Sequence, residues 1–133
     1  MKALDTNVLI RFLVRDEKRQ AESVYKTFKQ AESDNELLFI PLPVLLETVW
    51  VLESVYKIKR QDVLDSIDAL LLMPILEFES QSTIMSFVSS ARETKTELSD
   101  LLIAHSARSA GCECVLTFDK RASNFGFFEL LSL

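Results

Sequence analysis

The sequence is poor in the residues that build turns, disulfides and zinc sites: its 133 residues include two glycines, three prolines, two cysteines and one histidine. So few turn residues exclude a many-stranded sandwich or barrel and favour a helix-rich domain. Cys112 and Cys114 are separated by one residue, so they cannot easily bridge each other or complete a structural zinc site. We therefore expect a domain without disulfides, located in the cytoplasm.

Long apolar runs are also missing. The longest uncharged apolar stretches, such as Ala69–Leu76, are too short to cross a bilayer. Asp5 interrupts the stretch that would have to be apolar in a signal peptide. We therefore expect neither secretion nor a membrane partner.

Positive charge is in deficit as well, because 20 acidic residues outnumber 15 basic ones and the formal net charge is −5. Proteins that hold nucleic acid by bulk electrostatics are usually basic, so we expect no DNA binding by the chain alone. A nucleic acid substrate is still compatible with this charge if metal ions supply positive charge locally. Hydrophobic residues make up 48% of the chain, which favours one globular domain over residues 1–133.

Apolar segments typical of strands alternate with amphipathic segments typical of helices. Strands are expected at Lys2–Asp5, Leu37–Ile40, Ile75–Phe78, Glu113–Phe118 and Phe127–Leu131. Helices are expected at Val8–Val14, Arg15–Ala31, Val44–Tyr56, Gln61–Met73, Ser80–Thr94 and Leu98–Ala110. This alternation predicts an α/β fold, a three-layer α/β/α sandwich around a parallel sheet. Ligands of such folds bind beyond the carboxyl ends of the strands.

Two aspartates follow predicted strands directly, at the end of the sheet where that rule places a site. Asp5 ends the first strand, and Asp119 comes after the strand that ends at Phe118. For either residue alone, capping of the next helix is a good alternative, because aspartate is a favoured capping residue.

Two more acids stand out because their helical neighbours are apolar. Glu47 has Pro43, Val44, Trp50 and Val51 at the positions three and four residues away, and an ionised carboxylate on an apolar face needs a partner or a metal. Asp100 heads a stripe formed by Ile103, Ala104 and Ala107, which we expect to be buried. The alternatives are an exposed or salt-bridged position for Glu47 and a simple contact with the helix dipole for Asp100.

Four carboxylates at one end of a sheet would repel one another, since two like charges at about 4 Å cost about 4 kcal/mol at an effective dielectric near 20. Their pKa values would rise, or a cation would bind between them. Oxygen ligands without histidine or cysteine favour Mg²⁺ or Mn²⁺ over zinc. One or two such ions would support phosphodiester hydrolysis by an activated water.

Two motifs resemble those of a known family. The segment Leu4–Ile10 is similar to the opening motif of PIN-domain ribonucleases. Ser99–Ala104, followed by Gly111 and Val115–Lys120, is similar to the family's C-terminal signature, and Glu47 lies in a segment similar to its central acidic helix. The small size without an added domain resembles the VapC toxins of toxin–antitoxin pairs.

This resemblance implies an endoribonuclease that depends on Mg²⁺ or Mn²⁺, with one or two ions per site. It also implies a five-stranded parallel sheet, a homodimer and a cognate antitoxin protein that blocks the site. By position, the acidic quartet of catalytic and metal-binding residues is Asp5, Glu47, Asp100 and Asp119.

Further residues are expected around this quartet. Thr6, Asn7 and Thr117 would orient carboxylates or water, and Glu97 would be an auxiliary ligand or a solvated acid at a helix start. Arg11, Lys120 and Arg121 are expected to contact RNA phosphates because they are close in sequence to Asp5 or Asp119. The segment after Asp119 carries no further acid, so the choice between one and two metals stays open.

Two other functions fit parts of the sequence. In a haloacid-dehalogenase-like phosphotransferase Asp5 would be the nucleophile, but that class has a second acid two positions on, where this chain has Asn7. A non-catalytic interaction module with a PIN fold is the other alternative. Metal-independent cleavage through the 2′-hydroxyl is disfavoured because the one histidine, His105, is expected on the polar side of its helix.

Overall fold

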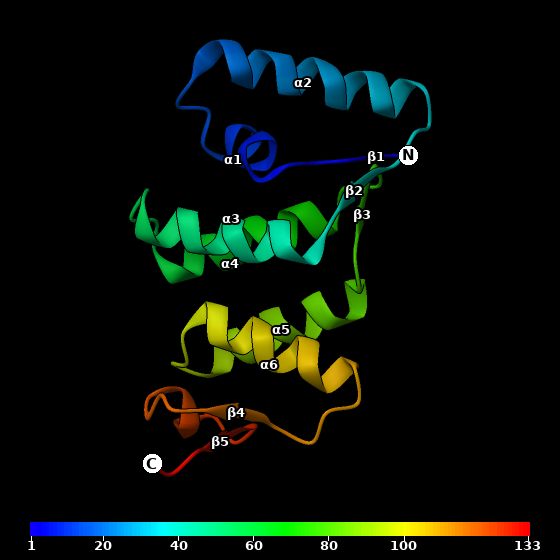
Figure 1. The fold of residues 1–133 in the computed structure, drawn as a ribbon. Helices are drawn as coiled ribbons and strands as arrows, with labels where there is room; N and C mark the ends of the chain where they lie inside the picture. The colour runs from blue at the N-terminus through cyan, green and yellow to red at the C-terminus, as the bar shows by residue number, and fades with distance from the viewer. The chain divides into compact units, whose positions relative to one another are not determined.

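The computed structural model describes residues 1–133 and contains six α-helices, five short strands and one 3₁₀ segment (Figure 1). The strands are β1 (Lys2–Ala3), β2 (Leu38–Ile40), β3 (Leu76–Phe78), β4 (Val115–Thr117) and β5 (Phe128–Leu130). The helices are α1 (Thr6–Val14), α2 (Lys18–Ser33), α3 (Leu42–Ser54), α4 (Arg60–Leu71), α5 (Gln81–Glu93) and α6 (Leu98–Ser109). The 3₁₀ segment η1 spans Ala122–Asn124. The predicted elements are all present, with ends that differ by up to three residues.

The chain divides into two compact units, Met1–Gln81 and Ser82–Leu133. In the first unit, β1, β2 and β3 form a parallel sheet with β2 in the centre. Helix α1 packs against α2 and α3, α3 packs against α4, and α4 contacts β3. The core of this unit is made of aliphatic side chains, among them Leu9, Ile40, Leu45, Val49 and Ile67.

Proline fixes the point where β2 gives way to α3. Pro41 is the N-cap residue of α3, and Pro43 follows in its first turn, where the missing backbone N–H would have no helical partner. The Glu79 carboxylate accepts a hydrogen bond of 2.8 Å from the Leu42 backbone N–H. The start of α3 is therefore tied to the end of β3, which places Glu47 one turn into the helix.

In the second unit, β4 and β5 form a parallel two-stranded sheet, and η1 lies between them in the chain. Gly111 follows α6 with a φ of 91°, a left-handed conformation that favours glycine. Its N–H donates to the carbonyl of Arg108, and the Cys112 N–H donates to that of Ala107, each at 3.0 Å. These two bonds form a Schellman motif, which ends α6 within one residue of the predicted end at Ala110.

The strand pairing differs from the sequence prediction in one respect. An α/β fold with parallel strands is confirmed, but the five strands pair as a three-stranded and a two-stranded sheet rather than as one sheet of five. Each strand has only two or three residues, so each offers few backbone groups for pairing. None of the helices is both long and apolar enough to cross a membrane.

Candidate metal and RNA site

Asp5 lies at the turn between β1 and α1, where it is the N-cap residue of the helix. Its Oδ1 accepts a hydrogen bond of 2.8 Å from the Thr6 backbone N–H, as the capping alternative required. The Asp5 side chain is exposed, and Thr6 beside it is buried. Capping uses only one of the two carboxylate oxygens, so it is compatible with metal binding by the other.

Glu47 is exposed on α3, so the prediction that it lies on a buried apolar face is wrong. The buried side of α3 is formed by Leu45, Thr48, Val49 and Leu52. Trp50, which is one of the predicted apolar neighbours of Glu47, is itself 55% exposed. The carboxylate of Glu47 therefore needs no partner to offset burial, and its role as a metal ligand depends on the family resemblance alone.

Asp100 lies in the first turn of α6 and is partly buried. Burial raises the pKa of the Asp100 carboxyl above its ordinary value, and the carboxylates of Glu97 and then Asp119 raise it further. Asp100 is therefore close enough to both acids for their charges to repel its own. Glu97 and Asp100 come from the start of α6, whereas Asp119 follows β4. A bound cation would relieve this repulsion.

The buried stripe of α6 was predicted only in part, since Ala104 is buried as expected but Ile103 is not. Ile103 is 43% exposed, whereas the buried residues are Leu98, Leu101, Leu102, Ala104 and His105. His105 is thus buried rather than on the polar side, and its Nε2 has no hydrogen-bond partner. Asp100 lies beside the buried stripe, not at its head.

Asp119 follows β4 and caps the next segment of the chain. Its Oδ1 accepts hydrogen bonds from the backbone N–H groups of Arg121 at 2.8 Å and Ala122 at 3.4 Å. The Thr117 hydroxyl accepts a bond of 2.9 Å from the backbone N–H of Asp119 itself. Thr117 therefore helps to fix the turn that carries Asp119, and its expected role in orienting a carboxylate or a water stays a prediction.

The carboxylates gather only in part. The carboxylates of Glu97 and Asp119 raise the pKa of Asp100 within the second unit, whereas Asp5 and Glu47 belong to the first unit. No three acidic, histidine or cysteine side chains stand ready around one metal position. The donor set nevertheless fits Mg²⁺ or Mn²⁺, because it consists of oxygen ligands whose mutual repulsion favours a cation. Convergence of all four acids stays a prediction.

A cavity of about 340 Å³ adjoins these acids in the second unit. Its walls include Lys95, Glu97, Asp100, Arg121, Asn124 and Phe125. Sequence reasoning missed Lys95, Asn124 and Phe125. Asn124 and Phe125 could have been found from their positions five and six residues after Asp119, because so short a segment stays close to the site.

The basic residues predicted to contact RNA differ in their surroundings. Arg11 is engaged within the first unit, where its Nε donates to Gln20 Oε1 at 2.7 Å and its Nη1 to the Tyr56 hydroxyl at 3.2 Å. Its Nη1 also lies 3.3 Å from Asp16 Oδ1. Lys120 and Arg121 are both exposed, and Arg121 Nη1 lies 3.7 Å from Glu97 Oε1. Asn7, the predicted support beside Asp5, is exposed as well.

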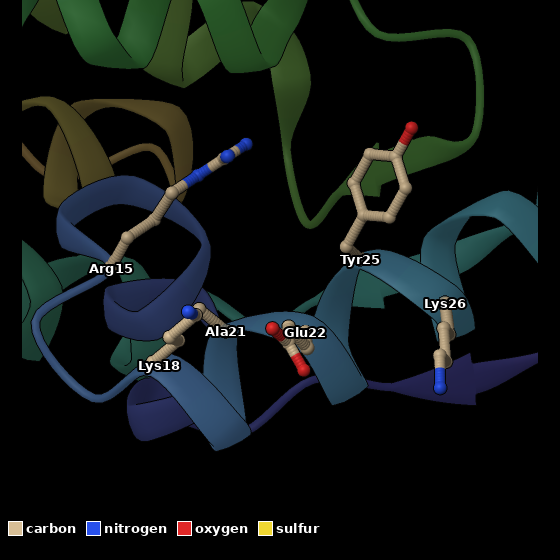
Figure 2. A pocket seen from close by; sticks show the side chains of 6 residues that line it. All are labelled: Arg15, Lys18, Ala21, Glu22, Tyr25 and Lys26. Carbon is tan, nitrogen blue, oxygen red and sulfur yellow. The ribbon is translucent and has the colours of Figure 1, made fainter.

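A second cavity, of about 400 Å³, lies along α2 (Figure 2). Figure 2 shows the side chains of Arg15 and Tyr25 extending in the same general direction, with Ala21 and Glu22 between them. The remaining wall residues are Lys18 and Lys26. This cavity is cationic and contains none of the predicted carboxylates, so it has no ligand set for a divalent metal.

The α/β fold agrees with comparisons to known proteins. The model of the PIN domain matches residues 2–127, so the chain belongs to the PIN-domain family. Over 127 residues it is 29% identical to the VapC ribonuclease of Aquifex aeolicus (strain VF5), an alignment that covers 96% of this chain and 93% of that protein.

The buried His105 provides a test of the packing of α6. Burial lowers the pKa of His105 below its ordinary value of 6.5, and the Arg108 guanidinium lowers it further. The unfolded chain therefore binds more protons than the folded chain below about pH 6.5, so the free energy of unfolding should decrease as the pH falls through the folded-state pKa, by at most about 1.4 kcal/mol per pH unit. Urea unfolding of the His105→Leu variant should show a weaker pH dependence between pH 7 and pH 5 than the wild type does; equal slopes would contradict the burial of this side chain.

Proposed function

We propose that the protein is a divalent-metal-dependent endoribonuclease and the toxin of a toxin–antitoxin pair. The observation that carries the proposal is the acidic group of Glu97, Asp100 and Asp119, in which Asp100 has a raised pKa and lines a cavity whose walls also include Lys95 and Arg121. Such a group attracts a cation, and the cavity offers room for a substrate beside it. Membership of the PIN-domain family and the similarity to a VapC ribonuclease support RNA as the substrate.

In the proposed mechanism, Asp5, Asp100 and Asp119 hold Mg²⁺ or Mn²⁺, and Glu47 contributes directly or through water. When bound, the ion supplies positive charge that stabilises the phosphodiester transition state. Thr117 fixes the turn that presents Asp119, and the backbone N–H groups bound to Asp119 Oδ1 fix the orientation of its carboxylate. Thr6, Asn7 and Glu97 surround the ligands as supporting groups.

The one histidine supports hydrolysis by water over attack by the 2′-hydroxyl of RNA. Attack by the 2′-hydroxyl needs a general acid and a general base that reach the ribose, and histidine commonly fills one of these two roles. His105 is buried within α6, and burial holds its pKa low. Attack of water on phosphorus would break the bond to the 3′-oxygen and leave 5′-phosphate and 3′-hydroxyl ends.

Three further properties belong to this proposal. A cognate antitoxin protein would bind the toxin and block its site. The chain would act in the cytoplasm and form a homodimer.

Removal of the metal tests the proposal directly. Total RNA incubated with the protein and Mg²⁺ or Mn²⁺ should be cut at internal positions, and EDTA should abolish cleavage because the carboxylates alone carry no positive charge to bind the phosphate. Sequencing of the fragments should find 5′-phosphate ends. Cleavage that persists in EDTA, or 2′,3′-cyclic phosphate ends, would contradict the metal-dependent hydrolysis.

A further inference from the structure

The cavity beside Asp100 has walls of mixed chemistry. Two carboxylates, Glu97 and Asp100, lie on one part of its wall. Two cations, Lys95 and Arg121, and two residues with a planar group, Asn124 and Phe125, supply other parts. Positive, planar polar and aromatic groups side by side are the chemistry that binds a nucleotide of single-stranded nucleic acid.

The two cations are available for phosphate binding. Lys95 is exposed. Arg121 Nη1 lies 3.7 Å from Glu97 Oε1, with side chains that are 83% and 63% exposed, respectively. An ion pair this open to solvent contributes little to stability, so the guanidinium can leave Glu97 for a phosphate, which it can bind through two N–H groups.

The ring of Phe125 is held in place by the packing around it. Its centroid lies 6.3 Å from that of His105 and 6.4 Å from that of Phe128, and it packs against a small cluster that includes Ala104 and Ala122. The side chain is nevertheless only partly buried and lines the cavity. A fixed, accessible ring loses little conformational entropy when a base stacks on it.

Asn124 completes the set at the end of η1. Its side chain is exposed, and its amide carries two N–H donors and an acceptor oxygen. Such an amide can pair with the edge of an unstacked base and thereby prefer one base over another.

We infer, on the basis of the proposed function, that this cavity holds the nucleotide of single-stranded RNA next to the cleaved phosphodiester. Lys95 and Arg121 bind phosphate oxygens, Phe125 stacks on the base, and Asn124 contacts the edge of the base. The carboxylates on the same wall place the bound strand beside the metal ligands. The cavity is therefore both a binding site and a determinant of which RNA is cut.

Gly126 offers a way to fill the cavity without disturbing its walls. It lines the cavity, its φ lies outside the left-handed region, and a Cβ atom added to it would meet no other atom within 4 Å. The Cβ atom of a leucine at this position therefore meets no steric obstacle. Gly126→Leu should leave the fold intact and exclude the nucleotide.

The test measures binding of a short, fluorescein-labelled single-stranded RNA in Mg²⁺. All variants carry Asp5→Asn, so that the RNA stays intact. Lys95→Ala should raise the Kd about fivefold to tenfold and reduce the slope of log K against log salt concentration by about 0.7, the value for one phosphate contact to a single strand. Gly126→Leu should raise the Kd at least about tenfold, since it removes both stacking and phosphate contacts.

Asn124→Ala tests base recognition separately. It should narrow the differences in Kd among four RNAs that differ only at one base, with little effect on the salt slope, because a neutral amide releases no counterion. The matched control is Lys26→Ala, which removes a lysine from the cationic cavity along α2 and should leave the Kd unchanged. Thermal unfolding checks that every variant is folded.

The outcomes separate this inference from the proposed function. If the wild type cuts RNA with Mg²⁺ but folded Lys95→Ala and Gly126→Leu variants bind RNA as tightly as their parent, the cavity assignment is wrong and the nuclease proposal stands. A loss of affinity in Lys26→Ala equal to that in Lys95→Ala would also overturn the cavity assignment, since RNA binding would then depend on net charge alone. Failure of the wild type to bind or cut any RNA would overturn both proposals.

Discussion

Asp100→Asn and Asp5→Asn are each expected to slow RNA cleavage about a thousandfold, a loss of about 4 kcal/mol of transition-state stabilisation. Each change replaces a negatively charged oxygen ligand by a neutral amide of nearly the same shape. The bound cation would lose affinity and position, although the substrate cavity would keep its walls. Cleavage of a labelled RNA in excess Mg²⁺ measures the effect.

Both variants should remain folded, for reasons that differ between the two sites. Asparagine caps helices about as well as aspartate, so Asp5→Asn can keep the bond to the Thr6 N–H. At position 100, a neutral side chain removes the repulsion from Glu97 and Asp119, which raises the pKa of the native carboxyl. The free energy of unfolding of Asp100→Asn near pH 7 should therefore equal or exceed that of the wild type.

Asp62→Asn is the matched control. Asp62 lies in the first turn of α4, as Asp100 does in the first turn of α6, so both substitutions remove the same favourable contact with a helix dipole. Asp62 is exposed, whereas Asp100 is partly buried. Cleavage by Asp62→Asn should be unchanged. Full activity of a folded Asp100→Asn or Asp5→Asn variant would remove the basis of the proposed mechanism.

The elements of the fold could be predicted from the sequence because local signals mark their ends. Gly111 ends α6 through a conformation that other residues rarely adopt, and Pro41 and Pro43 begin α3. Asp5 and Asp119, which follow β1 and β4, could be predicted as site residues for the same reason, because each comes directly after a short apolar run. These signals lie within a few residues of the feature that they predict.

The buried faces of α3 and α6 could not be predicted in this way. Both helices are apolar on several sides, so more than one stripe with helical spacing can be drawn through each. On α6 the stripe through Leu98, Leu101, Leu102 and His105 is buried, whereas the stripe through Ile103 was the one expected. The choice between them is made by packing against other elements, which periodicity does not contain.

The cavity walls escaped prediction for a related reason. Lys95 precedes α6, whereas Asn124 and Phe125 follow β4, and only the fold of the second unit brings these segments together. In the sequence, nothing distinguishes these three residues from other surface or core residues. Their shared chemistry becomes visible only in the cavity.

Loss of metal affinity is the second large effect expected, because metal binding by acids from both parts of the chain underlies the whole account. Asp100 would contribute a carboxylate that its acidic neighbours destabilise, so a divalent cation would gain binding energy by relieving that repulsion. Asp5 would contribute a carboxylate whose Oδ1 is held by the helix cap, which would limit the entropy lost when the second oxygen binds the ion. Removal of either charge should therefore weaken the same site.

Calorimetric titration with Mn²⁺ near neutral pH measures this directly, with Asp62→Asn as the control. The wild type and the control should bind Mn²⁺ with the same affinity, and Asp5→Asn and Asp100→Asn should each bind at least about tenfold more weakly, a difference of about 1.4 kcal/mol or more. Unchanged Mn²⁺ affinity in both folded variants, or no Mn²⁺ binding by the wild type, would contradict a shared metal site.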